Sequence, residues 1–434
     1  MILITTIGLR RYERTVYRWE DGQAFETRFF AEALCKWLKP TEVRVLLTKG
    51  AEGSDNWRDL RSALEGRALV VPVAIPDGAN EAEVWEIVRV LTGSIAKDEV
   101  VLDVTHGFRS LPFLVAMTAA FLRAAGKMNV TGIYYGAFDA RDGDNVAPVF
   151  DLTPLLHLLD LAGATSIFTA TGDAARLGRL LVDQHVVARR NPSSSMLAEE
   201  APVRLRNLGS RIEDLALALG MGRPAEAPKA AAALLACLDE ARAQAEVERW
   251  LPAFGLLLDE IRATYAPLAR PGDDLDAELA SQWPLIEWYF DRGQTFVAVP
   301  VAREWLVSIV CRMNGLQWMQ RDERERAEKC LTALVRAASG DHVDSARGSD
   351  ALTTGDLAVP LPAEIANLWQ NVCGFRNDAM HCGLTLAPGQ TARDVRSAGS
   401  LSSGIEGLCG SLQDVAAACG WASGSGDMRA VSIP

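Results

Sequence analysis

The chain has 434 residues, which is enough for two or three domains. Apolar residues make up 49% and charged residues 23%, a composition typical of globular domains that bury sizeable cores. The formal net charge of −12 argues against a nonspecific polyanion-binding protein, which is usually basic overall. A local pocket for a small anionic ligand is still compatible with this charge.

The eight cysteines lie apart, with no CxxC pair and no Cys/His cluster at zinc spacing. We therefore expect reduced thiols in a cytoplasmic protein and no metal site. The first residues form an apolar run that soon turns polar and has no leading positive region, which predicts a strand rather than a signal peptide. No apolar run approaches the roughly 20 residues of a membrane span, so no membrane partner is expected.

Residues 1 to about 150 alternate between short apolar runs and segments with helical periodicity. The strands are predicted at residues 1–8, 42–50, 68–76, 99–105, 130–138 and 146–152. The helices are predicted at 27–38, 56–64, 81–95 and from 111 onwards. Strands rich in Val, Ile and Leu that alternate with helices indicate a mostly parallel sheet covered on both faces, which is a Rossmann-like α/β fold.

Beyond about residue 153 the strand signals stop, and the chain is rich in Ala, Leu and Arg with helical periodicity, which predicts an all-α second domain. One predicted helix, at 291–305, has an apolar stripe that includes Phe296 and Val299 and is expected to be buried. Residues 339–362 are polar and Gly-rich, which is typical of a long loop or a flexible insertion.

Polar residues gather where three of the predicted strands end, and ligands of open α/β sheets bind outside those carboxyl ends. The end of the 99–105 strand carries Asp103, Thr105, His106, Gly107 and Arg109; the other two ends carry Gly8, Arg10 and Thr48. A strand-Gly-helix junction offers free backbone N–H groups and a positive dipole end.

Two interpretations of this first site stand side by side. Thr105, His106 and Arg109 could contact phosphate oxygens or base edges, while Asp103 holds the loop by accepting its N–H groups. Alternatively, Asp103 and Thr105 only cap a helix and His106 is a satisfied polar residue. Because neither GxGxxG nor GxxxxGK[ST] is present, a dinucleotide or nucleoside-triphosphate site is weakly supported.

A second polar cluster lies near the C-terminus, in "RNDAMH" at residues 376–381. Arg376 and His381 are five residues apart, or about 140° on a helix, so they do not share a face; Asn377 and His381 do. Such a pair converges most easily near a helix start or across a two-fold axis. Arg and His without a metal suit RNA cleavage by the ribose 2′-OH. Surface ion pairs on an ordinary helix are the competing interpretation.

Both clusters resemble signatures of one family. "DVTHGFR" at residues 103–109 is similar to the motif of the CRISPR-associated DxTHG-motif proteins, which carry a CARF domain. "RNDAMH" resembles the RxxxxH signature of HEPN ribonucleases. The order of the two resembles the ancillary ribonucleases of type III CRISPR systems.

The resemblance implies a CARF sensor domain at residues 1–155 and a helical HEPN ribonuclease domain at 156–425. It implies that a homodimer, or an assembly of dimers, binds a cyclic oligoadenylate, with cyclic tetra-adenylate favoured over the hexamer. The implied effector-binding residues are Gly8, Arg10, Thr48, Thr105, His106, Gly107 and Arg109. The implied catalytic residues are Arg376, Asn377 and His381.

The resemblance further implies metal-independent cleavage of single-stranded RNA at a composite site to which both chains contribute, leaving a 2′,3′-cyclic phosphate and a 5′-OH. Two alternatives stay open. The chain could be a non-catalytic sensor that relays the messenger signal to a partner protein. The CARF domain could also degrade its own cyclic ligand. A transcription regulator would need a basic recognition helix, and the sequence contains none.

Overall fold

The computed structural model describes residues 1–19, 22–94, 99–106, 110–190, 202–338, 363–381 and 396–421. Contacts divide the chain into two compact units, the first ending at Gly163 and the second containing Ala164–Arg190 and the residues from Glu200 onwards. Gly163 lies inside the helix Leu155–Thr171 (α6), whereas the predicted boundary at 155/156 coincides with the start of this helix. The predicted insertion at 339–362 lies outside the described residues.

The first unit is built on an eight-stranded sheet with the order β3-β2-β8-β7-β6-β1-β4-β5. The strands are β1 Ile2–Thr6, β2 Thr15–Arg18, β3 Ala24–Thr27, β4 Glu42–Leu47, β5 Leu69–Ala74, β6 Glu99–Asp103, β7 Asn129–Gly136 and β8 Val146–Asp151. Its helices are α1 Phe30–Leu38, α2 Lys49–Glu52, α3 Asp55–Leu64, α4 Glu81–Ser94 and α5 Ser110–Ala124, followed by the start of α6, with a 3₁₀ turn at Phe138–Ala140.

The predicted parallel sheet is confirmed, since β1 pairs in parallel with both β4 and β6, and β7 continues the parallel series beyond β6. Two antiparallel pairings, β7 with β8 and β2 with β3, make the other edge mixed. The strands β2 and β3 were not predicted. Each has only four residues, two apolar and two polar, so neither forms a long apolar run.

The sheet is covered on both faces, as predicted, because successive residues of a strand point to opposite sides. Leu3 of β1 belongs to a core shared with α1 and α3, which includes Phe30, Leu34 and Leu60. Its neighbour Ile4 belongs to a second core with α4 and α5. The period-two alternation along β1 therefore divides one strand between two separate hydrophobic cores.

Gly136 of β7 packs directly against rings of the first core, and replacing it with alanine is expected to destabilise the protein. A Cβ atom there would meet a ring atom of Tyr17 at 2.7 Å and one of Phe30 at 2.8 Å, and both rings are fully buried. Overpacking of this kind costs about 1–3 kcal/mol of unfolding free energy, which urea unfolding followed by tryptophan fluorescence would measure. Gly143→Ala is the matched control, since nothing lies within 4 Å of its Cβ position. Equal unfolding curves for the two variants would contradict the packing argument.

The described residues of the second unit contain helices and no strand, which confirms the predicted change of fold class. The helices are α7 Ala175–Arg190, α8 Arg204–Gly220, α9 Ala227–Leu238, α10 Ala241–Trp250, α11 Pro252–Gly255, α12 Leu258–Tyr265, α13 Leu275–Asp291, α14 Thr295–Met313, α15 Arg321–Ala338, α16 Ala363–Met380 and α17 Ala398–Ala418, with a 3₁₀ turn at Ala266–Leu268. None of the helices in the described part is long and apolar enough to cross a membrane.

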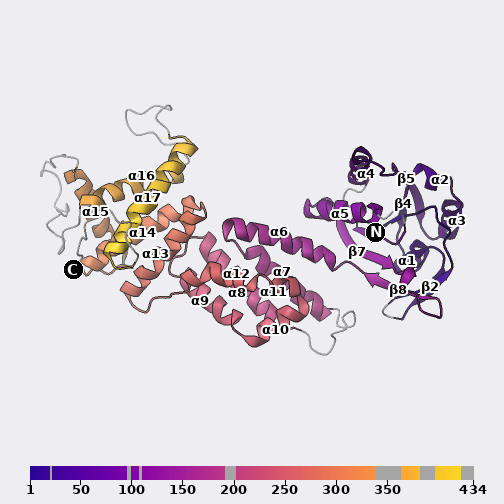
Figure 1. Ribbon diagram of the computed structural model, residues 1–434. Helices are drawn as coiled ribbons and strands as arrows, with labels where there is room; N and C mark the ends of the chain where they lie inside the picture. Colours follow the sequence, from indigo (N-terminus) through magenta and orange to yellow (C-terminus); the bar gives the residue numbers. More distant parts are fainter. Residues whose placement is uncertain are drawn as a thin grey trace. The chain divides into compact units, whose positions relative to one another are not determined.

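Helix α14 lies at the centre of the last five helices, in contact with α13, α15, α16 and α17 (Figure 1). Trp305 is its largest buried side chain, and its indole N–H donates to the carbonyl of Leu279 at 3.0 Å. The predicted burial of Val299 is confirmed, but that of Phe296 is wrong, because 58% of Phe296 is exposed in the first turn of α14.

Candidate functional site

Asp103 closes the end of β6 and connects it to the neighbouring strand β1. Only 1% of the residue is exposed, and its carboxylate accepts two hydrogen bonds. The Thr5 hydroxyl donates at 2.7 Å and the Thr105 N–H at 2.9 Å. The interpretation that Asp103 holds the loop by accepting its N–H groups is therefore confirmed, with β1 as an additional partner.

Threonine hydroxyls fix the same loop from two further sides. The Thr105 hydroxyl oxygen accepts from the N–H of Gly136 in β7 at 2.8 Å. The Thr6 hydroxyl donates to the carbonyl of His106. Both contacts are to the backbone, so these side chains first of all hold the loop after β6 between β1 and β7. The Thr105 hydroxyl keeps its own hydrogen, which a ligand oxygen could accept.

The imidazole of His106 stacks on the ring of Tyr12, with 4.2 Å between the ring centroids. The Tyr12 hydroxyl oxygen accepts from the N–H of Gly8 at 2.6 Å. Burial lowers the pKa of His106, and the nearby charge of Asp103 opposes this only in part, so the ring is neutral at pH 7. Its Nε2 atom is buried and has no hydrogen-bond partner among the described residues. Tyr12 therefore links the loop after β1 to the loop after β6.

Asn56 holds the loop after β1 from a third direction. Its side-chain amide donates to the carbonyl of Gly8 at 2.8 Å and to the carbonyl of Arg10 at 2.7 Å. Asn56 lies in the first turn of α3 and is 9% exposed, whereas the side chain of Arg10 is exposed. The backbone around Arg10 is thus anchored while its guanidinium stays at the surface.

A small depression lies at the carboxyl ends of β1, β4 and β5. Gly8 and Thr48 are among its lining residues, and the Thr48 hydroxyl caps α2 by accepting from the N–H of Ala51 at 3.4 Å. Its other lining residues are Ile7, Leu9, Ala51, Pro76, Asp77, Gly78, Ile87, Leu111 and Leu114.

The seven predicted effector-binding residues are therefore divided. Gly8 and Thr48 line the same depression. Thr105 and His106 lie on the other side of β1, and His106 contacts Thr6 and Tyr12. Arg10 is exposed next to Gly8. The predictions for Gly107 and Arg109 lie outside the described residues.

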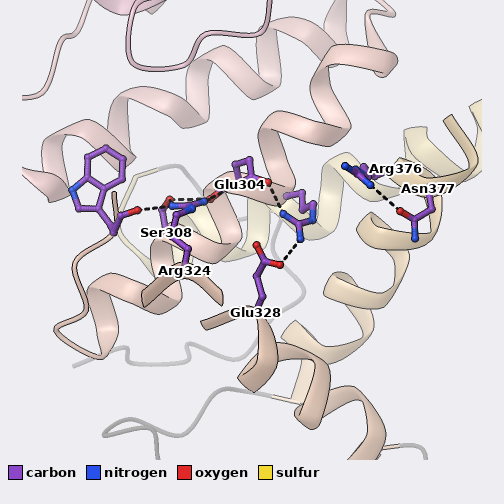
Figure 2. A network of polar contacts seen from close by, with 8 residues as sticks. Glu304, Ser308, Arg324, Glu328, Arg376 and Asn377 are labelled. Carbon is purple, nitrogen blue, oxygen red and sulfur yellow. Dashed lines mark hydrogen bonds and ion pairs between the residues drawn. The ribbon is translucent and has the colours of Figure 1, made fainter. Parts of the chain in front are cut away.

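The three predicted catalytic residues lie at the C-terminal end of α16. Asn377 belongs to its last turn, Arg376 directly precedes that turn, and His381 follows the last residue of the helix. The N–H of His381 donates to the carbonyl of Asn377 at 2.9 Å, which extends the helical turn to His381. The Arg376 guanidinium donates to the Asn377 side-chain oxygen at 3.2 Å (Figure 2).

Two arrangements were expected for an Arg and a His at this spacing, near a helix start or across a two-fold axis. The prediction of a helix start is wrong, because both residues lie near the end of α16. The negative end of the helix dipole lies there, and it stabilises cationic side chains. Asn377 and His381 are exposed and Arg376 is partly exposed. Among the residues that the structure describes, neither Arg376 nor His381 forms an ion pair. The competing interpretation, surface ion pairs, therefore finds no support at these two residues.

The acidic member of the motif does form an ion pair. Asp378 pairs with Arg396 at 3.2 Å, and the Arg396 guanidinium lies 4.9 Å from the centroid of the Phe375 ring. Arg396 comes from the residues just before α17. The carboxylate nearest in sequence to Arg376 is thus neutralised by another arginine.

Comparison with known families decides what the first unit is. Residues 2–139 match the family model described as the CARF domain of the CRISPR system endoribonuclease Csx1. The first unit contains a CARF domain. The expected CARF domain is confirmed, and "DVTHGFR" at residues 103–109, whose resemblance to the DxTHG motif predicted it, lies within the matched range.

A curated relative agrees with this assignment. The chain is 31% identical over 111 residues to CRISPR-associated protein MJ1674 of Methanocaldococcus jannaschii, a match that spans 25% of this chain and only 18% of that relative. Among solved structures, the chain is similar to Enterococcus italicus Csm6 bound to cyclic hexa-2′-fluoro-hexa-dAMP. The TM-score is 0.40 and the identity 11%, over 95% of this chain and 94% of that one.

Sequence reasoning missed two residues that shape the CARF site, Tyr12 and Asn56. Asn56 could have been found, because it shares a helix face with Leu60 and Leu64, and a polar residue in such an apolar stripe needs a buried partner. Tyr12 gave no comparable signal, since its partners His106 and Phe29 come from distant parts of the chain.

The neutral His106 predicts how stability depends on pH. Its folded-state pKa lies below the ordinary value of 6.5, so the unfolded chain binds more protons once the pH falls through about 6.5. Unfolding free energy should therefore decrease from pH 7 to pH 5. His185 has a lowered pKa, also mainly through burial, and adds to the same slope. His106→Gln should reduce the slope of unfolding free energy against pH, and His157→Gln, at an exposed position, should not. Urea unfolding at several pH values measures both slopes. Equal slopes for wild type and His106→Gln would contradict the role given to His106.

Proposed function

We propose that this chain is a cyclic-oligoadenylate-activated, metal-independent endoribonuclease that cleaves single-stranded RNA in type III CRISPR antiviral defence. One observation carries the proposal. A CARF domain is followed, in the same chain, by a helix whose exposed end presents Arg376 and His381 with no carboxylate of the described residues paired to either. The family model that matches the CARF domain belongs to an endoribonuclease family.

The effector is proposed to bind at the carboxyl ends of β1, β4 and β6, where the strand order changes direction around β1. Gly8 and Thr48 line the depression, and Arg10 lies beside it. On the other side of β1, Thr105 and His106 border residues 107–109, to which the resemblance assigns further contacts. Cyclic tetra-adenylate is the favoured ring size.

The chemistry at α16 is proposed to be attack of a ribose 2′-OH on the adjacent phosphate. His381 moves a proton at near-neutral pH, and Arg376 stabilises the charge that develops on the phosphorane oxygens. Asn377, which accepts a hydrogen bond from Arg376, orients that guanidinium. The products are a 2′,3′-cyclic phosphate and a 5′-OH, and the reaction as proposed needs only these side chains.

A homodimer is proposed as the working form, and an exposed stripe on α5 supports it. Phe113, Met117 and Phe121 follow one another at four-residue spacing, and 64%, 40% and 66% of them are exposed. Three large apolar residues on one helix face are costly to leave in water. A second copy of the CARF domain would cover this face. The resemblance implies that the helical domains pair as well, with the α16 ends of both chains forming one composite site.

The experiment that tests the proposal measures cleavage of a fluorescent single-stranded RNA in the presence of EDTA, with and without cyclic tetra- or hexa-adenylate. Cleavage that requires one of the two rings would support the proposed function and name the ring size. If the protein binds an effector tightly and cleaves nothing, the non-catalytic sensor is the better description. Decay of the cyclic ligand in a His381→Ala variant would identify a CARF domain that degrades its effector.

A further inference from the structure

Arg303 of α14 lies on the side of α16 that also carries Arg376. Its guanidinium is 5.0 Å from the centroid of the Trp369 ring, and only 18% of its side chain is exposed. Trp369 is seven residues before Arg376, which is close to two helical turns, so the two residues share a face of α16. Two arginines, one from each helix, therefore lie along the same side of α16.

Two carboxylates hold Arg303. Its Nη2 donates to Oε2 of Glu328 in α15 at 2.7 Å, and its Nη1 donates to Oε1 of Glu304 (Figure 2). The second oxygen of Glu304 accepts from Arg324 at 2.7 Å. Arg324 also donates to the Ser308 hydroxyl, at 2.9 Å. Both carboxylates of this network are thus occupied by arginines other than Arg376.

The thiol of Cys373 lies near these charges, close to Arg376 on α16. Cys373 is one turn before Arg376. Burial raises the pKa of this thiol; Arg303 and Arg376 lower it, and the carboxylate of Glu328 raises it. The geometry agrees with this: α15, which carries Glu328, packs against α16, and Arg303 joins Glu328 to the Trp369 side of α16.

We propose that Arg303 is a positioning residue: by engaging Glu328, it prevents this carboxylate from pairing with Arg376, whose guanidinium then stays free for the RNA phosphate. The inference rests on the proposed function. Arginine binds carboxylates and phosphates with the same planar fork of donors, so the two compete for it. Without Arg303, Glu328 would be an unpaired carboxylate on α15, which packs against α16, and Arg376 has no other ion-pair partner among the described residues.

The test compares Arg303→Met, Glu328→Gln and the double variant in the effector-dependent cleavage assay. Arg303→Met is expected to lower kcat/KM about 10- to 100-fold, since one electrostatic contact of this type is worth up to about 10³ in rate. The loss should appear in kcat as well as KM. Glu328→Gln alone should retain activity, and the double variant should recover most of it, because no carboxylate is left to capture Arg376.

A purely structural role for Arg303 predicts the opposite pattern. The double variant would then be as inactive as Arg303→Met, and this result, or unchanged activity of Arg303→Met, would overturn the inference. Arg312→Met is the matched control. Arg312 lies on the same helix, pairs with Asp276 and approaches the Trp421 ring at 6.0 Å, so the substitution removes a similar contact elsewhere. Its kcat/KM should stay within about threefold of wild type, as for a change away from the reacting groups.

A second measurement separates this inference from the proposed function. Affinity for a single-stranded RNA with 2′-O-methyl riboses, which cannot be cleaved by 2′-OH attack, is measured by fluorescence anisotropy with the same variants. Weaker binding by Arg303→Met and recovery in the double variant would support the inference even if wild type cleaved no RNA. Equal affinities of wild type and all variants would overturn it, whatever the outcome of the cleavage assay.

Discussion

Replacing His381 with alanine is expected to lower effector-dependent RNA cleavage by about 10²–10⁴-fold, the usual contribution of a side chain that transfers a proton in the transition state. Effector binding should be unchanged, since the substitution lies at the exposed end of α16 and outside the CARF domain. The measurement is a single-turnover cleavage assay with saturating cyclic oligoadenylate, combined with a separate effector-binding titration. Retained cleavage would remove His381 from the proposed mechanism.

Arg376→Ala is expected to cost about 10²–10³-fold, as for the loss of one group that stabilises developing charge. The double variant Arg376→Ala/His381→Ala should be little worse than the more damaging single variant, because residues that act as a unit are not additive. Gln370→Ala serves as the control, since Gln370 is an exposed polar residue of the same helix. Two independent, multiplicative losses would argue that Arg376 and His381 do not serve one reaction.

Subunit mixing tests whether the site is composite. If both chains contribute, an excess of His381→Ala protein should inhibit wild type by forming mixed dimers, beyond simple dilution. Phe121→Glu, placed in the exposed stripe of α5, should weaken that inhibition by preventing the exchange of subunits. Activity that only falls in proportion to dilution would contradict a composite site.

Asp103→Ala is expected to weaken effector binding by about 10²-fold and to destabilise the CARF domain. The Thr5 hydroxyl and the Thr105 N–H would both lose their acceptor in a buried place, and each unsatisfied donor costs about 1–3 kcal/mol. The loop that ends in His106 would then lose its link to β1. Urea unfolding and an effector titration by calorimetry measure the two effects.

The matched control for this prediction is Asp151→Ala. Asp151 also ends a strand and accepts from the N–H of a threonine two residues later, at 2.8 Å, but it is exposed. Its replacement should change the unfolding free energy by no more than about 0.5 kcal/mol, as is usual at the surface. Effector affinity should stay the same. If Asp103→Ala behaved like Asp151→Ala, the buried carboxylate would not be what holds the CARF loop.

The prediction from sequence was most successful where the signal is local. The strands β1, β4, β5 and β6 are rich in Val, Ile and Leu, β7 and β8 are also largely apolar, and the helices between them show apolar periodicity. The four-residue strands β2 and β3 were missed because their pairing depends on distant residues: β2 pairs with β8, about 130 positions later in the chain. A short, half-polar strand is stabilised by such a partner and leaves little trace in its own composition.

The candidate sites divide in the same way. The chemical identities of Asp103, Thr105 and His106, and of Arg376 and His381, with their spacings, were sufficient to suggest the family and its chemistry. Whether Asp103 holds the loop or only caps a helix was left open, because its decisive partner Thr5 is 98 residues away. That Arg376 and His381 end a helix rather than begin one was also not evident from their spacing.

By itself, then, the sequence of this protein determined the order of the two folds, most strands of the parallel sheet and the residues whose side chains could bind a ligand or take part in a reaction. All of these depend on residues that are neighbours in the chain. Only the tertiary structure decided which side chains hold the CARF loop and which carboxylates are already neutralised beside Arg376. The physical reason is that hydrogen bonds and ion pairs such as Thr5–Asp103 and Arg303–Glu328 join residues that the fold, and not the chain, makes neighbours.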